Sequence, residues 1–244
     1  MHGTNGKNNA NREYAVADEI EQRPSVLASL RTLLPARALT LYEALRLAEL
    51  QANRLLELQG IHEAPVPSEI VSGLPRIHVT YDLDMPVSGA SNWDTKRKSW
   101  VITLHATEPD TRHRITMLHE YKHIIDHGHA GMIAPLGRTY FGLTPLEYVA
   151  EYFAGCVLMP KRLVKRAWGE RVQRPEDLAE LFDVSTRAIE VRLVQLGLTT
   201  PTARCASARV ATYRRTFVPA RRGSYHRQFS LRWPSATASL GVRA

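Results

Sequence analysis

The spacing of leucines predicts a long amphipathic helix near the start of the chain. Leucines recur every three or four residues in LYEALRLAELQANRLLELQG, residues 41–60. Side chains three and four positions apart share one face of a helix, so this stretch offers an apolar face to a core. Thr40 and Glu43 form a capping-box pattern at its start, and Gly60 ends it. The stretch SVLASLRTLL predicts a shorter helix before it.

Alternation of apolar and polar residues then replaces the helical spacing. The segment RIHVTYDL, residues 76–83, alternates and is rich in β-branched side chains, as strands are. A second strand is predicted at SWVITLH, residues 99–105, after the polar turn DTKRK. We therefore expect a small antiparallel sheet of about three strands ahead of the central helices.

Two further helices follow the predicted sheet. The first covers about residues 109–128, with a proline in its first turn and a glycine as its stop. Its apolar residues lie on most sides, which indicates a central buried helix. Thr144, Pro145 and Glu147 open the second, and Pro160 should end it.

The last part with regular spacing is helical. KRLVKRAWGERVQ precedes PEDLAELFDVSTRAIEVRLVQLGL, in which two short helices flank a turn at DVS. This pair resembles a helix-turn-helix, although the mixed charges of the second helix favour a structural or docking role over DNA reading. The fold class is thus α+β, with a small antiparallel sheet packed on the central helix at about residues 109–128 and a helical C-terminal part. We expect a disordered stretch at 1–24, helices at 25–64, the core at 65–160, the helix-turn-helix-like part at 161–200 and a basic, disordered tail at 201–244.

Composition fits a soluble cytoplasmic protein. The 244 residues are 44% hydrophobic, enough to form a core without disulfides, and the two cysteines have no metal-binding spacing. No apolar run reaches the roughly 18 residues of a membrane span, and the first residues lack the apolar segment of a signal peptide. We therefore expect no membrane partner.

The net charge of +8 is concentrated at the end of the chain. Residues 201–244 contain nine arginines with no lysine and no acidic residue, which leaves the remainder near neutrality. A basic tail of this kind predicts disorder, with contact to nucleic-acid phosphates as the functional alternative.

The run HEYKH, residues 119–123, carries the candidate chemistry. On a helix His119 and His123 lie on one face and can bind a single metal ion. Glu120 is turned by about 100°, where it can hydrogen-bond a water held by the metal without becoming a ligand. This pattern is typical of zinc hydrolases, in which the glutamate is the general base. The alternative is that the two histidines satisfy each other in a core.

Two residues compete for the place of third ligand. His129 has the spacing of a metzincin, but Asp126 stands where that pattern has a glycine for an abrupt turn. Glu147, on the next helix, would complete a His₂Glu site of the gluzincin type, with Glu151 one turn further in a supporting role. Glu147 can also serve only as a helix cap, because it lies three residues after a threonine.

The segments RHRITMLHEYKHIIDH and E-x-x-A-E-Y-F-A-G-C-V-L-M-P resemble the ImmA/IrrE family of metallopeptidases. The likeness covers roughly residues 65–198. It implies one zinc ion per chain held by His119, His123 and Glu147, with Glu120 as the general base. This chain departs from the family motif at Lys122, where a glycine is usual, and at Glu151, where asparagine is usual. We expect the side chain of Lys122 to point away and extend its amine towards solvent.

The resemblance also implies a function. Family members act on transcriptional repressors, so we expect a zinc endopeptidase that cleaves a helix-turn-helix repressor in a stress or mobile-element response. The strand at 99–105 is a candidate for pairing with an extended substrate. His127 is a candidate to support a metal ligand from behind, and it also joins Tyr140 and Tyr148 as a candidate to stabilise the oxyanion. The alternative is a DNA-binding or antirepressor regulator with little proteolytic activity.

Overall fold

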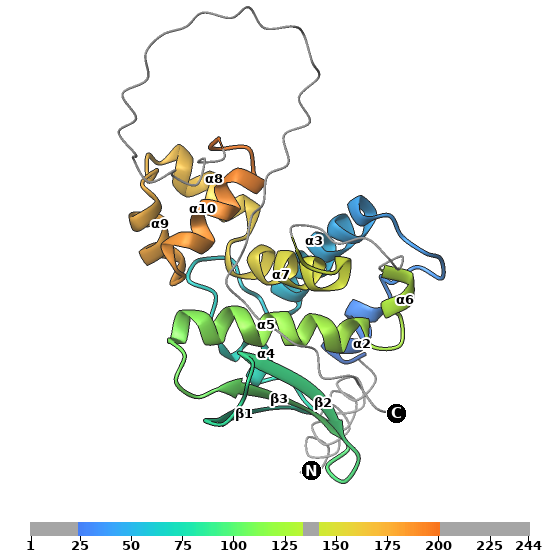
Figure 1. The fold of residues 1–244 in the computed structure, drawn as a ribbon. Coiled ribbons are helices and arrows are strands. Elements are labelled where there is room, and N and C mark those ends of the chain that lie inside the picture. The colour runs from blue at the N-terminus through green and yellow to red at the C-terminus, as the bar shows by residue number, and fades with distance from the viewer. Residues whose placement is uncertain (1–23, 134–141, 201–244) are drawn as a thin grey trace, which may run out of the picture.

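The protein is α+β, and its central helix is sandwiched between a small sheet and other helices. The computed structural model describes residues 24–133 and 142–200. Helix α5 (Asp110–Asp126) lies across one face of the sheet, and α7 (Pro145–Leu158) packs on the opposite side of α5, next to α3 (Leu41–Leu58) (Figure 1). Helices α8, α9 and α10 gather at the end of the molecule where α5 begins.

The predicted N-terminal helices are present. Helix α2 (Val26–Arg31) precedes α3, whose first turn contains the expected capping box. The Thr40 side chain accepts a hydrogen bond from the Glu43 backbone N–H, and the Glu43 carboxylate accepts one from the Thr40 N–H at 2.9 Å. These bonds satisfy backbone donors that a helix start leaves free, so the start of α3 is fixed locally. A short helix, α4 (Glu69–Ser72), follows α3 and contacts α5.

The sheet has three strands in the order β1-β3-β2 and is mixed, so the prediction of an antiparallel sheet is wrong for one pair. Strands β2 (Gly89–Asp94) and β3 (Ser99–His105) form an antiparallel hairpin. Strand β1 (Ile77–Asp82) pairs with the other edge of β3 and runs parallel to it. Strand β2 runs opposite to both β1 and β3, so the chain reverses direction twice between them and β3 points the same way as β1.

The sequence pattern did not identify β2, and it misplaced the open edge of the sheet. The strand reads GASNWD, which is rich in residue types that are depleted in strands. The prediction that β3 pairs with a substrate is wrong, since β3 is hydrogen-bonded to a strand on each side. Within the described residues, the unpaired strand edges belong to β1 and β2.

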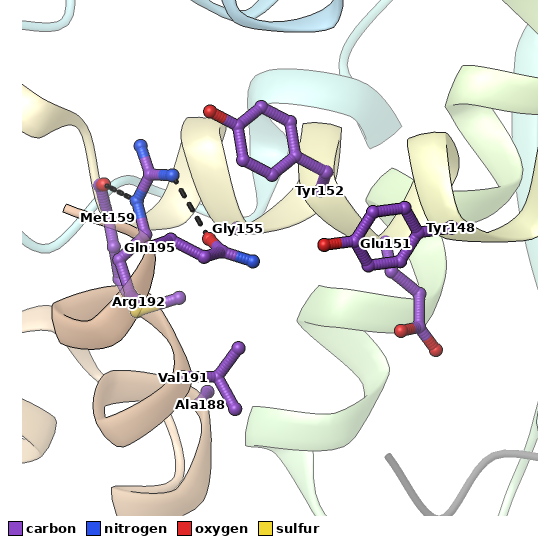
Figure 2. A pocket seen from close by; sticks show the side chains of 9 residues that line it. All are labelled: Tyr148, Glu151, Tyr152, Gly155, Met159, Ala188, Val191, Arg192 and Gln195. Atoms are coloured by element: carbon purple, nitrogen blue, oxygen red, sulfur yellow. Dashed lines mark hydrogen bonds between the residues drawn. The ribbon is translucent and has the colours of Figure 1, made fainter. Parts of the chain in front are cut away.

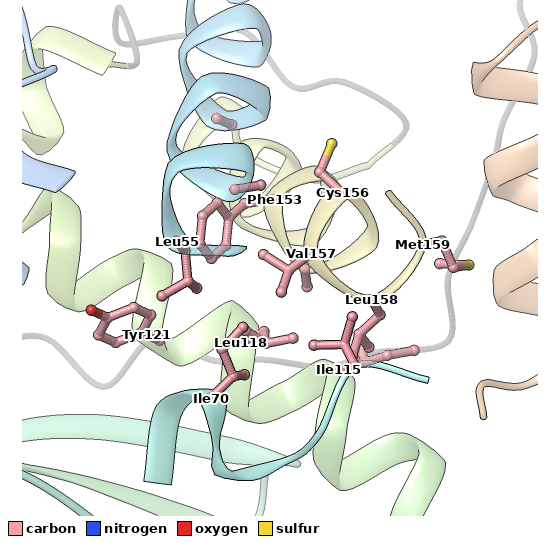
Figure 3. Close-up of a cluster of buried hydrophobic side chains, with 14 of the residues drawn as sticks. Leu55, Ile70, Ile115, Leu118, Tyr121, Phe153, Cys156, Val157, Leu158 and Met159 are labelled. Atoms are coloured by element: carbon pink, nitrogen blue, oxygen red, sulfur yellow. The ribbon is translucent and has the colours of Figure 1, made fainter. Parts of the chain in front are cut away.

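The core forms where α5 meets α3, α4 and α7. Figure 3 shows Ile115, Leu118 and Tyr121 of α5 against Leu55 of α3 and Phe153 of α7. Most residues of α5 from Arg114 onward are buried, as predicted for a central helix. The helix ends at Asp126, with Gly128 just beyond it at a φ of 84°, a conformation that glycine adopts without steric cost.

The chain ends its described part in small helices. After α5 come the short α6 (Ala130–Ile133) and then α7, which begins after Thr144 as predicted. Helices α8 (Lys161–Gly169), α9 (Pro175–Phe182) and α10 (Thr186–Gln195) follow. Helices α9 and α10 pack against each other across the expected turn. Their description as a helix-turn-helix stays a prediction.

Several expectations concern residues outside the described ranges. These are the expected disorder at residues 1–24, of which only the last lies within the described ranges, the basic tail 201–244 and the role of Tyr140. Among the described helices, none combines the length and the hydropathy needed to cross a bilayer.

Candidate metal centre

The two histidines of the predicted motif lie together on α5. His119 and His123 are one turn apart, and their Nε2 atoms are 3.0 Å from each other. Their rings are tilted edge to face, with centroids 4.7 Å apart. His119 is buried and His123 is partly exposed, so the pair faces the surface along one edge.

Glu147 reaches the same point from the first turn of α7. The Thr144 side chain caps this helix by accepting a hydrogen bond from the Glu147 N–H at 3.3 Å. The Glu147 carboxylate turns towards α5, where its Oε2 lies 3.1 Å from His119 Nε2 and its Oε1 lies 3.4 Å from His123 Nε2. Packing of α7 on α5 thus brings the carboxylate to both imidazoles.

In this cluster the carboxylate and the imidazoles each stabilise the charged form of the other. Burial alone would raise the pKa of Glu147, but hydrogen bonds from His119 and His123 outweigh it and hold that pKa well below its usual range. Burial also works to lower the pKa of His123, and the adjacent Glu147 carboxylate more than offsets this, so the pKa is raised. The carboxylate is therefore ionised at neutral pH and available to a cation.

The spacing of the three side chains matches a zinc site. In the described part of the chain, His119, His123 and Glu147 are the group whose ligand atoms all lie within 4.8 Å of one another. A tetrahedral zinc ion bound at about 2.0–2.1 Å requires ligand atoms about 3.4 Å apart. The observed separations of 3.0, 3.1 and 3.4 Å are close to that value. The donor set therefore fits the ion, and the ligand role of each residue stays a prediction.

The structure brings Glu147 to the histidines and places His129 elsewhere. Helix α5 continues through Asp126, so the chain makes no abrupt turn at the position where the metzincin pattern has its glycine, and His129 is not among the residues that meet at the cluster. The His129 Nδ1 atom lies 3.4 Å from the carbonyl oxygen of His127. This arrangement disfavours the metzincin alternative.

Glu120 is buried beside the cluster and held by the sheet. The Ser91 hydroxyl of β2 donates a hydrogen bond to Glu120 Oε2 at 3.0 Å. Gly89, two residues earlier on β2, packs directly on α5, and a Cβ there would overlap the Thr116 side chain and lie 3.3 Å from Glu120 Cγ. Sequence reasoning missed Ser91 because β2 itself was not predicted. Once the strand is known, its alternation places Gly89 and Ser91 on one face.

The remaining candidates lie around this centre. Glu151 and Tyr148 line a small cavity between α7 and α10, together with the buried Arg192 (Figure 2). Burial and the Glu151 carboxylate raise the pKa of Tyr148. His127 follows the last residue of α5, and its ring packs against Trp100 of β3 at 4.9 Å. The supporting roles of Glu151 and His127 stay predictions.

Lys122 does not extend to solvent, so that expectation is wrong. Its side chain is 0% exposed, and its amine donates to the buried Asp126 carboxylate, at 2.6 Å from Oδ2. The two residues are one helical turn apart on the buried side of α5. Asp126 thus provides the counter-charge that a buried lysine needs. Lys122 itself stands where the resembled family usually has a glycine.

Residues 77–194 match the model of the peptidase M78 family, described as the IrrE N-terminal-like domain. The chain contains an IrrE N-terminal-like domain. The match confirms the resemblance that the helix motifs suggested. This IrrE-like domain runs from β1 into α10 and includes the two histidines, Glu120 and Glu147, so the protein has a metallopeptidase-like fold with a candidate metal site.

Other comparisons add little to the family match. A transcriptional regulator from Mycobacterium tuberculosis is similar in structure over 60% of this chain, with a TM-score of 0.46 and 18% sequence identity. The similarity covers 46% of that protein, so this chain spans less than half of its length. No curated protein sequence matches the chain.

Proposed function

We propose that the protein is a zinc-dependent endopeptidase. The observation that carries this proposal is the convergence of His119, His123 and Glu147 on one point. Glu120 lies next to His119 on α5. Two imidazoles and one carboxylate form the donor set of catalytic zinc sites that keep a position open for water. One ion per chain is expected.

Zinc bound at this centre would supply Lewis-acid chemistry, because it lowers the pKa of water and polarises a carbonyl group. Glu120 then acts as the general base that accepts a proton from the attacking water and later returns it to the leaving amine. The hydrogen bond from Ser91 fixes one oxygen of the Glu120 carboxylate and leaves the other for this transfer. Burial of Glu120 excludes competing water molecules from the carboxylate.

The substrate that we propose is a helix-turn-helix transcriptional repressor of a stress or mobile-element response. Support comes from the ImmA/IrrE resemblance, now confirmed at the level of the family. The helices α9 and α10 are a candidate docking unit for such a protein, and the arginines of residues 201–244 are candidates for nucleic-acid contact. Cytoplasmic localisation belongs to the same proposal.

Co-expression with the repressor encoded nearest the gene tests this function. Wild-type protein should convert the repressor into shorter fragments, and Glu120→Gln should leave it intact because the general base is lost. Removing zinc with a chelator should have the same effect as Glu120→Gln. A repressor released from DNA by both wild type and Glu120→Gln, without cleavage, would instead favour the antirepressor alternative.

A further inference from the structure

Three aromatic rings form a ledge at the end of the β2–β3 hairpin. The ring of Trp93 meets that of Trp100 at 5.5 Å, and Trp100 meets His127 at 4.9 Å, both edge to face. Trp100 is buried, whereas Trp93 is 42% exposed and His127 is also exposed. The buried indole therefore supports two rings that present apolar surface to solvent.

This aromatic ledge lies on the side of the sheet that faces the candidate catalytic base. Gly89, Ser91 and Trp93 alternate along β2 and share one face of the strand. Gly89 packs on α5, and Ser91 binds Glu120, so Trp93 lies one step further along the same line. The step from Ser91 to Trp93 is about 7 Å, because a strand rises about 3.4 Å per residue.

The outer edge of β2 is a candidate for pairing with an incoming chain. Strand β2 pairs with β3 on one side, and no other strand in the described ranges pairs with its second side. Such an edge offers backbone donors and acceptors to an extended peptide. Side chains of a peptide paired there would also fall on the ledge face at every second residue.

The carboxylate that follows Trp93 is engaged within the hairpin turn. The Asp94 carboxylate accepts hydrogen bonds from the backbone N–H groups of Lys96 and Arg97 in the hairpin turn. The Arg97 guanidinium lies 3.6 Å from the same carboxylate. Asp94 is thus already paired with a cation and with backbone donors, so the contact offered to a ligand by Trp93 itself is its exposed ring, which favours an uncharged side chain.

We propose that the aromatic ledge of Trp93, Trp100 and His127 is a specificity subsite for an extended protein segment. It takes a large apolar or aromatic side chain about two residues from the peptide bond placed beside Glu120. The inference deepens the proposed peptidase function by naming the chemistry of the substrate near the cleaved bond. It rests on that function only for the role of Glu120.

Peptide binding to the full chain tests the subsite without requiring cleavage. The probes are fluorescently labelled eight-residue peptides that carry Phe, Leu, Ala or Asp at one position, moved along the peptide in turn. With zinc present and in a Glu120→Gln background, peptides with Phe or Leu at one position should bind about tenfold more tightly than the Ala peptide. Trp93→Ala should abolish this preference, and Trp93→Phe should keep most of it.

Tyr81→Ala is the matched control. Tyr81 is an exposed aromatic residue on β1, the opposite edge of the sheet, where its ring packs on His113. This variant should keep the full preference for Phe and Leu. His127→Ala is a second test at an exposed residue of the ledge and should lose part of the preference for Phe and Leu. Thermal melting checks that each variant is folded.

The outcomes separate the subsite from the catalytic activity. Glu120→Gln protein that shows no preference among the peptides, or no binding to any of them, would overturn the subsite, and so would a preference that survives Trp93→Ala. Peptides that bind with the expected preference but are not cut by the protein with Glu120 intact would contradict the peptidase function and leave the subsite standing. Cleavage of the peptides without a preference at any position would support the peptidase function and overturn the subsite.

Discussion

Glu120 is held in place by two small residues of β2. The hydroxyl of Ser91 binds one carboxylate oxygen, and Gly89 lets the strand approach the stem of the same side chain. The motif HEYKH is local, so the sequence alone was enough to propose its histidines and glutamate. The contact with Ser91 joins residues 29 apart in the sequence and depends on a strand of low propensity, so no local pattern predicts it.

Ser91→Ala should reduce catalysis without loss of the metal. The variant loses one hydrogen bond to a charged group, worth about 1.5 kcal/mol, so kcat should fall roughly tenfold while KM stays near the wild-type value. Ser91→Thr keeps the hydroxyl and should recover most of the rate. Steady-state kinetics on a cleaved peptide, with zinc content measured in parallel, checks this. An unchanged kcat in Ser91→Ala would show that Glu120 needs no support from β2.

The elements were predictable where one segment sets its own structure. The capping box of α3 and the glycine after α5 are encoded within a few residues, and both were found from sequence. The direction of β1 relative to β3 depends on which strand occupies the centre of the sheet, which no strand encodes by itself. The buried partner of Lys122 was also missed, although it lies one turn away on α5, because burial is set by packing against other elements.

Breaking the Lys122–Asp126 ion pair should destabilise the protein, and removing both charges should not. Burial lowers the pKa of Lys122 and raises that of Asp126, so each charge depends on the other. Lys122→Met leaves a buried carboxylate alone and should lower the free energy of unfolding by about 3–5 kcal/mol. The double variant Lys122→Met/Asp126→Leu should recover most of that loss in urea denaturation. A double variant no more stable than the single one would contradict this account.

In the whole molecule, arginines fix both ends of α5 to distant parts of the chain. The buried guanidinium of Arg114 donates to the Val66 carbonyl and to the carbonyl and carboxylate of Asp183, between α9 and α10. Arg31 of α2 donates to the last carbonyls of α5, at 2.6 Å from Ile124 and 3.2 Å from Ile125. These hydrogen bonds join residues that lie about 50 to 90 positions apart in the sequence, so a single sequence does not reveal them. The proposed division at residue 160 therefore crosses a polar link that ties α5 to α9 and α10, and that division stays a prediction.

Arg114→Ala should destabilise the protein much more than the loss of a surface arginine. It leaves several acceptors, including a buried carbonyl, without their charged donor and should cost about 3 kcal/mol of unfolding free energy. Arg187→Ala is the control, because the Arg187–Glu190 pair on α10 is partly exposed to solvent and should contribute less than about 1 kcal/mol. Denaturation by urea measures both. Equal losses of unfolding free energy in the two variants would show that the Arg114 link contributes no more to stability than a surface ion pair.

The claim on which the function depends is that His119, His123 and Glu147 bind one metal ion. Isothermal titration of zinc into the metal-free full chain measures this directly. We expect one ion per chain in wild type, loss of tight binding in His123→Ala and in Glu147→Ala, and full binding in His129→Ala. Wild-type protein that binds no zinc at this centre, or Glu147→Ala protein that binds it as tightly as wild type, would contradict the account.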